Sequence, residues 1–367
     1  MFTTADHEYM TLALRLAEKG LFSTTPNPRV GCVLVNHGKI IGQGAHLKAG
    51  EPHAEIIALG DAKQHFPDLI KGADVFVTLE PCSHFGLTPP CANALIDAGV
   101  KRVVVAMQDP NPKVAGSGLA QLSHAGILVQ SGLMEVEAQA LNAGFINRMT
   151  QNRPFVRLKI AASLDGGTAL ANGESQWITG ESARLDVQHW RARSCAILTG
   201  SGTVIADDPQ MNVRHIQGAR QPLRVIVDSQ LRISPEAKIL VGSNTLIAYA
   251  KDTQQHADKL THLQATLLNI PGNDGRVCLK ALLSHLASLG INELMVEAGQ
   301  TLNGALLADD LVDELIIYYA PLLLGSNARG MLAIPALQSM QDRLALKLID
   351  VRQFGRDLRV IARPIRR

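Results

Sequence analysis

Short apolar runs alternate with amphipathic segments along the first part of the chain, up to about Asn147. Apolar side chains with helical spacing predict a helix over 6–19. Two β-branched runs that flank Asn36-His37-Gly38 predict a hairpin with strands at 30–35 and 39–44. Further predicted elements are a helix from near Pro52, strands at 75–79 and 103–107, and a helix over 91–98 that ends at Gly99. This alternation predicts a layered α/β domain.

A second block of the same kind follows the short polar link Gln151-Asn152-Arg153-Pro154. Its amphipathic segments predict helices over 182–192 and 279–289. Its apolar runs predict strands at 155–160, 196–199, 224–227, 245–250, 293–296, 314–319 and 358–362. The final connections are unlike short βαβ crossovers, which favours antiparallel pairing at that end. We therefore expect two α/β domains, 1–150 and 151–367.

Composition agrees with two folded domains and narrows the class of protein. The 367 residues are 46% hydrophobic and 19% charged, enough to bury two cores. A net charge of +2 disfavours a broad nucleic-acid-binding surface. No apolar stretch approaches roughly 18 residues, and residues 1–9 lack a signal-peptide pattern, so no membrane partner is expected. Five scattered cysteines favour free or metal-bound thiols in a reducing cytoplasm.

Three side chains of metal-binding type lie in short motifs of the first block: His53, Cys82 and Cys91. One imidazole and two thiolates suit Zn²⁺, and three protein ligands leave a fourth position for water. Glu55, two residues after His53, can take a proton from that water and give it to a leaving amine. A structural zinc site or chance clustering are the alternatives, although closed structural sites use four ligands. We therefore expect one catalytic zinc ion.

The order His-x-Glu, Pro-Cys, Cys is the signature of zinc-dependent deaminases, with one departure: eight residues separate Cys82 from Cys91 instead of two. This long loop resembles that of the riboflavin-pathway pyrimidine deaminases. Other motifs extend the resemblance over the whole chain: Pro26-Asn27-Pro28-Arg29-Val30-Gly31, Gly50-Glu51-Pro52-His53-Ala54-Glu55, Asp109-Pro110-Asn111-Pro112, Ala161-Ala162-Ser163-Leu164-Asp165-Gly166 and Glu297-Ala298-Gly299. The chain resembles the bifunctional riboflavin biosynthesis deaminase–reductases, the RibD family.

The resemblance implies a cytidine-deaminase-like three-layer α/β/α domain followed by a dihydrofolate-reductase-like α/β domain. The first would remove the 2-amino group of 2,5-diamino-6-ribosylamino-4(3H)-pyrimidinone 5′-phosphate. Positions implied to line the ring and the ribosyl phosphate are Asn27, His46, Asp109 and Asn111. Taken alone, the two asparagines could be turn residues beside prolines, and His46 a loop histidine. Leu87 stands where the family usually has a cation facing the phosphate, and Lys48 is a candidate substitute.

The second block lacks the Gly-x-Gly-x-x-Gly fingerprint of common dinucleotide-binding folds. Instead, a strand at 293–296 leads through Gly299 to a predicted helix from near Thr301, which leaves backbone N–H groups free for an anion. Such turns are common, and it is the resemblance that implies NADPH as the cofactor. The implied cofactor positions are Ala161, Trp177, Thr203, Asp207, Ser229, Gly299, Gln300, Thr301, Leu302, Asn303, Gly304 and Ala305.

The implied substrate positions of the reductase are Lys159, Ser175, Arg191, Met211, Arg214 and Glu297. The guanidinium groups of Arg191 and Arg214 have a fork geometry that suits a ribose 5-phosphate. Alternatives are a solvated helix face for Arg191 and a core position for Trp177. The implied reaction is hydride transfer to C1′ of the opened ribosyl imine of 5-amino-6-(5-phosphoribosylamino)uracil, which gives the ribitylamino product.

Two other functions fit part of the sequence. A nucleoside or nucleic-acid deaminase that edits bases would need a basic groove with stacking aromatics, and only 4% of residues are aromatic. A structural-zinc interaction module conflicts with a three-ligand site beside Glu55. We expect a cytoplasmic enzyme that acts on small phosphoribosyl pyrimidines, without a nucleic-acid partner, and forms a homo-oligomer, either a dimer or a tetramer.

Overall fold

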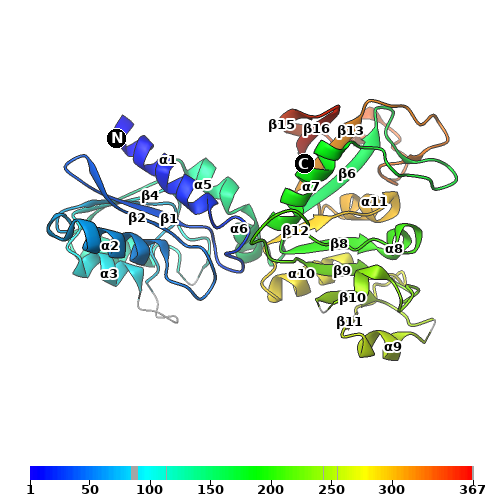
Figure 1. The fold of residues 1–367 in the computed structure, drawn as a ribbon, viewed down its shortest axis with the longest axis horizontal. Helices are drawn as coiled ribbons and strands as arrows, with labels where there is room; N and C mark the ends of the chain where they lie inside the picture. Colours follow the sequence, from blue (N-terminus) through cyan, green and yellow to red (C-terminus); the bar gives the residue numbers. More distant parts are fainter. Residues whose placement is uncertain (84–89, 113, 243, 254, 366–367) are drawn as a thin grey trace. The chain divides into compact units, whose positions relative to one another are not determined.

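The computed structural model describes residues 1–367 except 84–89, 113, 243, 254 and 366–367, so Leu87 lies outside the described residues. The chain forms two compact units, Met1–Asn152 and Arg153–Arg367 (Figure 1). Each unit has its own sheet and its own buried apolar clusters. Among the described residues, we find no helix that combines the length and the apolar character needed to cross a bilayer.

The first unit is built on a five-stranded sheet in the order β2-β1-β3-β4-β5. β1 pairs antiparallel with β2 and β3, whereas β3, β4 and β5 run parallel. The strands are β1 (Gly31–Asn36), β2 (Lys39–Ala45), β3 (Asp74–Val77), β4 (Arg102–Val105) and β5 (Leu128–Ser131). The predicted hairpin is confirmed, and its turn residues His37 and Gly38 both have positive φ.

Helices cover both faces of this sheet and give the expected three layers. α1 (Thr4–Glu18) and α2 (Ala54–His65) approach the hairpin so closely that glycine is required. A Cβ atom on Gly31 would lie 1.9 Å from the Ala13 carbonyl oxygen of α1, and one on Gly44 would lie 2.1 Å from that of Ala54 in α2. The other helices are α3 (Cys91–Asp97), α4 (Ser117–His124), α5 (Glu135–Leu141) and α6 (Ala143–Gln151).

The second unit is built on a nine-stranded sheet in the order β11-β10-β9-β8-β12-β6-β13-β16-β15. The strands from β11 to β13 are parallel, and β16 and β15 add antiparallel pairs, as the sequence predicted for that end. Their bounds are β6 (Phe155–Ser163), β8 (Ala196–Gly200), β9 (Leu223–Val227), β10 (Thr245–Tyr249), β11 (Thr266–Asn269), β12 (Glu293–Val296), β13 (Glu314–Ala320), β15 (Leu346–Phe354) and β16 (Asp357–Pro364).

Two buried clusters line opposite faces of the nine-stranded sheet. One includes Leu282 and Leu306, and the other includes Val187 and Leu260. The helices are α7 (Glu181–Arg193), α8 (Ser201–Asp207), α9 (Ala257–His262), α10 (Leu279–Ser288) and α11 (Gln300–Ala308). A separate two-stranded sheet joins β7 (Gly167–Ala169) to β14 (Arg329–Gly330). The α/β layering brings the carboxyl ends of parallel strands together at one edge of the sheet.

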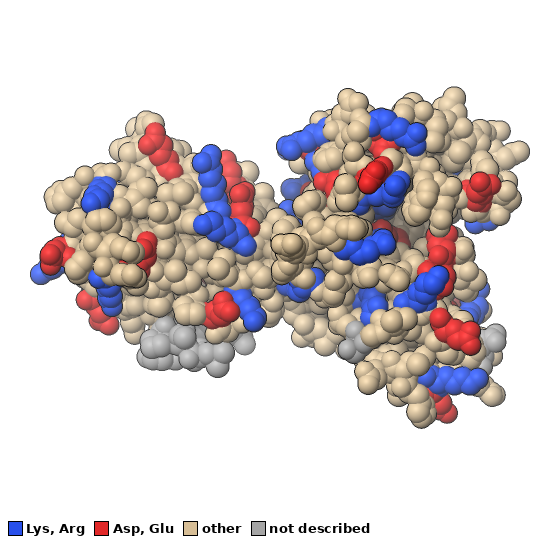
Figure 2. All heavy atoms as spheres, viewed as in Figure 1, with Lys and Arg blue, Asp and Glu red and all other residues tan. Residues whose placement is uncertain are grey.

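Charge and apolar exposure are distributed differently on the surface. Basic and acidic side chains are interspersed over the described surface of each unit that Figure 2 shows. Apolar exposure gathers on β15 and β16, where Leu346, Leu348, Val351 and Leu358 are all exposed. Leu348 pairs with Ala362 and Val351 pairs with Val360, so the four exposed apolar side chains lie on one face of the sheet.

Candidate active sites

The first unit brings its three predicted metal ligands together. The ligand atoms of His53, Cys82 and Cys91 all lie within 4.8 Å of one another. His53 Nδ1 is 3.6 Å from Cys82 Sγ and 3.3 Å from Cys91 Sγ. Tetrahedral coordination at ordinary zinc bond lengths places a nitrogen and a sulfur ligand about 3.6 Å apart. The three side chains therefore fit a zinc ion with one coordination position left open.

Two helix starts position these ligands. His53 is the N-cap residue of α2, and Cys91 is the first residue of α3. Within the described residues neither helix has a side-chain cap, so backbone N–H groups and the positive helix ends are directed toward the ligands. The amide of Cys91 donates to Cys82 Sγ at 3.2 Å. Hydrogen bonds from Cys91 are the main reason that the pKa of Cys82 is lowered, which favours the thiolate.

Glu55 lies beside the metal ligands with a carboxylate that is only partly satisfied. The residue is 3% exposed, and its Oε2 has no hydrogen-bond partner among the described residues. Burial raises the pKa of Glu55 to about 7. A buried carboxyl group with an unused oxygen and a pKa near neutrality is suited to exchange protons with a bound water or substrate.

His46 lies between Asn27, another predicted substrate position, and the metal ligand His53. It is a loop residue, and it is buried. Its Nδ1 lies 3.1 Å from the Pro52 carbonyl oxygen, and its Nε2 lies 3.0 Å from Asn27 Nδ2. The carbonyl can only accept, so Nδ1 carries the proton and Nε2 accepts from Asn27. The His46 ring also contacts the His53 ring edge-on, with centroids 5.3 Å apart.

Glu80 is a residue of this site that the sequence analysis missed. Its buried carboxylate accepts four backbone N–H bonds: Oε2 from Asp109 and Gly116 at 3.1 and 3.0 Å, and Oε1 from Gly118 and Leu119 at 2.8 and 3.3 Å. Asp109 Oδ1 in turn accepts from the amide of Asn111 at 2.8 Å. Glu80 therefore holds the segment that carries both predicted substrate residues next to the stretch of chain leading to Cys82. Its place directly before Pro81-Cys82 was the only sequence signal.

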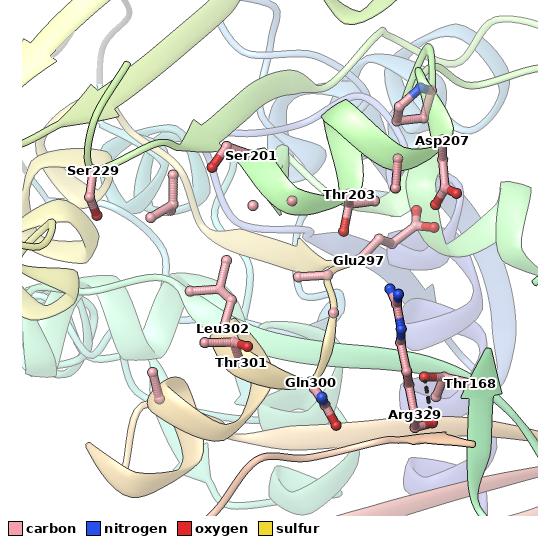
Figure 3. Close-up of a pocket in the computed structure, with 18 of the residues that line it drawn as sticks. Thr168, Ser201, Thr203, Asp207, Ser229, Glu297, Gln300, Thr301, Leu302 and Arg329 are labelled. Carbon is pink, nitrogen blue, oxygen red and sulfur yellow. Dashed lines mark hydrogen bonds between the residues drawn. The ribbon is translucent and has the colours of Figure 1, made fainter. Parts of the chain in front are cut away.

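The second unit contains a cavity of about 930 Å³ at the carboxyl ends of its parallel strands (Figure 3). Its volume is at the upper end of the range for ligand pockets, as a dinucleotide with a second ligand requires. Most of the residues predicted from the sequence line it: Lys159, Ala161, Ser175, Thr203, Asp207, Met211, Ser229, Glu297, Gly299, Gln300, Thr301, Leu302 and Ala305.

Two helices begin at the wall of this cavity. Gly200 is the N-cap residue of α8 and Gly299 that of α11, and within the described residues neither helix has a side-chain cap. A Cβ atom on Gly299 would meet nothing within 4 Å, which places open space next to the first turn of α11. Uncapped N–H groups beside open space suit the pyrophosphate of a dinucleotide, so the residues present fit NADPH.

Some predicted residues lie outside the lining. Trp177 is 68% exposed and has the Arg184 guanidinium 4.7 Å from its ring centroid, so it is not a core aromatic. Asn303 is buried and donates to the carbonyl oxygens of Ala298 and Met331. Gly304 permits close packing, because a Cβ atom there would lie 2.2 Å from the Ala333 carbonyl oxygen. Asn303 and Gly304 therefore support the loop at the cavity wall.

The two predicted phosphate-binding arginines are also outside the lining. Arg191 does not lie on a solvated face: it binds Glu297 through Nε at 2.6 Å and Nη2 at 3.0 Å. Its Nη1 donates to the Asn212 carbonyl oxygen at 3.0 Å. Lys159 Nζ lies 3.8 Å from Glu297 Oε2. Burial acts to raise the pKa of Glu297, but Arg191 and Lys159 outweigh it and bring that pKa to about 2.

A three-ligand metal site with a buried carboxylate in one unit, and a dinucleotide-sized cavity in the other, define a two-domain enzyme that combines a zinc deaminase with a nucleotide-dependent reductase. Family comparison agrees: residues 3–107 match the cytidine and deoxycytidylate deaminase zinc-binding region, and residues 154–360 match the RibD C-terminal domain. The chain belongs to the RibD family of bifunctional riboflavin biosynthesis enzymes, which use Zn²⁺ and NADPH.

Similar proteins match over nearly the whole chain. The riboflavin biosynthesis protein RibD of Escherichia coli K12 is 50% identical over 365 residues, which are 96% of this chain and 98% of the relative. Acinetobacter baumannii RibD (form 1) is 46% identical, with a TM-score of 0.91 over 99% of both chains. A diaminohydroxyphosphoribosylaminopyrimidine deaminase/5-amino-6-(5-phosphoribosylamino)uracil reductase from Thermotoga maritima is 32% identical, with a TM-score of 0.88 over 98% of this chain and 99% of that one.

Proposed function

We propose that residues 1–150 deaminate 2,5-diamino-6-ribosylamino-4(3H)-pyrimidinone 5′-phosphate and that residues 151–367 reduce the resulting 5-amino-6-(5-phosphoribosylamino)uracil. The activities named for the Thermotoga maritima relative support both substrates. The observation that carries the proposal is Glu55: its buried Oε2, which has no hydrogen-bond partner in the described part of the chain, lies beside a tetrahedrally spaced His-Cys-Cys set.

In the deaminase, the chain's own residues supply proton transfer and orientation. Bound zinc supplies a Lewis acid that makes water a nucleophile near neutral pH. Glu55 accepts a proton as water attacks the carbon that bears the 2-amino group, and returns it to the departing nitrogen, which leaves as ammonia. Asn27, His46, Asp109 and Asn111 orient the pyrimidine and its ribosyl group.

In the reductase, the backbone N–H groups at the start of α11 hold the cofactor pyrophosphate. NADPH supplies the hydride that adds to C1′ of the opened ribosyl imine. Lys159 lines the cavity beside Glu297, and burial lowers its pKa. We assign Lys159 as the donor of the proton that the imine nitrogen takes up, with Glu297 holding the ammonium group in place.

Substrate choice tests the deaminase assignment. The wild-type chain is incubated with the phosphorylated diaminopyrimidine or with cytidine, and released ammonia is measured, with Glu55→Gln as the matched inactive variant. The proposal expects ammonia from the diaminopyrimidine only, and only from the wild-type chain. Release from cytidine at a similar rate would favour a nucleoside deaminase instead.

We also infer a cytoplasmic homo-oligomer. None of the five cysteines, all of which the structure describes, forms a disulfide, which supports a reducing compartment. The exposed apolar face of β15 and β16 supports pairing with a second copy, because identical sheet faces related by a twofold axis are self-complementary. Analytical ultracentrifugation of Leu348→Asp should give a smaller species than the wild-type chain. An unchanged sedimentation coefficient would exclude this face.

A further inference from the structure

The hairpin turn between β15 and β16 lies against the start of α7. The helix lies beside these two strands (Figure 1), and Arg359 Nη1 of β16 donates to Asp186 Oδ2 of α7 at 2.7 Å. Gly355, with φ +61°, and Arg356 form the turn. A Cβ atom on Gly355 would lie only 3.0 Å from the hydroxyl oxygen of Ser182 in the first turn of α7. The hairpin and the helix therefore form one connected support.

Two charged residues of the hairpin bind the backbone of the segment that precedes α7. Arg356 Nη2 donates to the Ile178 carbonyl oxygen at 3.2 Å. The amide of Gly180 donates to Asp357 Oδ2 at 2.7 Å, and Arg356 Nε lies 3.7 Å from Asp357 Oδ1. Asp357 is 0% exposed, and a buried carboxylate is costly unless donors face it. Its position is therefore fixed by the Gly180 amide and the Arg356 guanidinium.

Arg184 of α7 holds the same segment from the helix. Its Nη1 donates to the Thr179 carbonyl oxygen at 2.7 Å, and its guanidinium carbon lies 4.7 Å from the centroid of the Trp177 ring. The backbone at 178, 179 and 180 is thus bound by three charged side chains from two elements. We call Arg184, Arg356 and Asp357 the clamp. Charged hydrogen bonds are stronger than neutral ones, so the clamp fixes this loop more firmly than water would.

The clamped segment leads directly to a residue of the cavity wall. Ser175, a predicted substrate position three residues before Ile178, lines the reductase cavity. On its other side the amide of Leu170 donates to the Glu174 carbonyl oxygen at 2.8 Å, which closes a turn after β7. Ser175 therefore lies between this turn and the clamp. A displacement of about 1 Å at a binding group can cost about 100-fold in rate, so the position of the segment matters to the reaction.

We propose that Arg356 and Asp357 are positioning residues of the reductase, which hold residues 178–180 so that Ser175 stays at the cavity wall and binds the substrate. This inference rests on the proposed function, which places the substrate in this cavity. Arg356 and Asp357 are not among the described residues that line the cavity, so their effect on the reaction passes through the segment that they hold. The Ser175 hydroxyl can donate and accept a hydrogen bond, as a contact with a sugar hydroxyl requires.

A double-mutant cycle tests whether the clamp acts through Ser175. The reductase KM is measured for full-length Arg356→Ala, Ser175→Ala and the double variant. The Arg356 side chain is 57% exposed, so its removal spares the fold. We expect each single change to raise KM about 5- to 10-fold at unchanged kcat, as loss of one hydrogen bond predicts, and the double variant to raise it no further. Asp357→Ala should match Arg356→Ala, and Asp357→Asn, which keeps an acceptor for the Gly180 amide, should restore most of the loss.

Hydrogen exchange gives a readout that does not depend on activity. In Arg356→Ala the amides of residues 178–180 should exchange faster while those of β13 keep their wild-type rates, which separates loss of the clamp from global destabilisation. Arg352→Ala is the matched control, because Arg352 lies on the same hairpin but binds Asp350 at 2.9 Å, and it leaves KM and exchange unchanged.

Two results would overturn the proposal: a KM that Arg356→Ala leaves unchanged, or an effect of Arg356→Ala that multiplies with that of Ser175→Ala. Failure of the proposed function is distinguishable, because the wild-type chain would then show no NADPH-dependent reduction of the phosphoribosylaminouracil.

Discussion

Glu297→Gln should destabilise the second unit at neutral pH by removing the charge that Arg191 and Lys159 neutralise. Glu297 is buried, and its pKa of about 2 lies well below the ordinary value of 4.5. A difference of this size corresponds to about 3 kcal/mol of favourable interaction for the ionised carboxylate. The glutamine has no charge, and it leaves two half-buried cations without their carboxylate partner, so we expect the unfolding free energy to fall by about that amount.

The pH dependence follows from the direction of the shift. A depressed folded-state pKa contributes stability above the unfolded value of 4.5, and this contribution is lost as pH falls toward 2. The difference between wild type and Glu297→Gln should therefore be full at neutral pH and shrink steadily below pH 4.5. The two proteins converge in acid because protonation turns Glu297 itself into a neutral side chain.

Tryptophan fluorescence provides the assay. The chain has two tryptophans, Trp177 and Trp190, and both lie in the second unit. Urea unfolding followed by this signal reports the second unit without contribution from the first. Glu236→Gln, an exposed carboxylate change in the same unit, is the matched control and should leave the midpoint unchanged. Equal stability of Glu297→Gln and wild type at neutral pH would refute the reasoning.

The first unit yields three further predictions. Glu55→Gln should keep zinc, measured by metal analysis, and lose deamination by roughly 10²- to 10⁴-fold with reduction intact; near-normal ammonia release would contradict the assigned role. Glu80→Ala should raise the deaminase KM roughly 10-fold at unchanged zinc content, because four backbone N–H groups lose their acceptor. An unaltered KM would show that the segment carrying Asp109 and Asn111 keeps its conformation without Glu80. Gly44→Ala should displace the start of α2 by about 1 Å, since its Cβ would lie 2.1 Å from the Ala54 carbonyl oxygen, and should cost roughly 100-fold in deaminase rate; unchanged rates would mean that the contact relaxes without moving His53.

Much of the architecture was predictable because its signals are local. The hairpin follows from Asn36-His37-Gly38, and β12 has the bounds predicted from the sequence, 293–296. α8 was not predicted, because Ser201-Gly202-Thr203 has low helix propensity and packing with β8 decides its conformation. β15 was missed because a register shift between Leu348 and Asp350 interrupts the alternation of apolar and polar residues along the strand. The helix expected near Pro52 begins at Ala54, with His53 as its N-cap.

The same holds for the candidate sites: features that depend on motif order could be predicted, and features that depend on the fold could not. Zinc ligation depends on residue types and motif order, so His53, Cys82 and Cys91 could be identified before any geometry was known. The partner of Arg191 could not, because Glu297 lies 106 positions away and only the fold joins them.

The central claim is that one chain carries out two reactions at two independent sites. The most direct measurement follows ammonia release and NADPH oxidation together, with the zinc-loaded and the chelator-treated chain, first from the diaminopyrimidine and then from the deaminated intermediate. We expect one ammonia per NADPH oxidised with the loaded chain. Chelation should stop both signals from the diaminopyrimidine and leave reduction of the deaminated intermediate unchanged. Ammonia release by the zinc-depleted chain, or loss of that reduction together with zinc, would contradict the account.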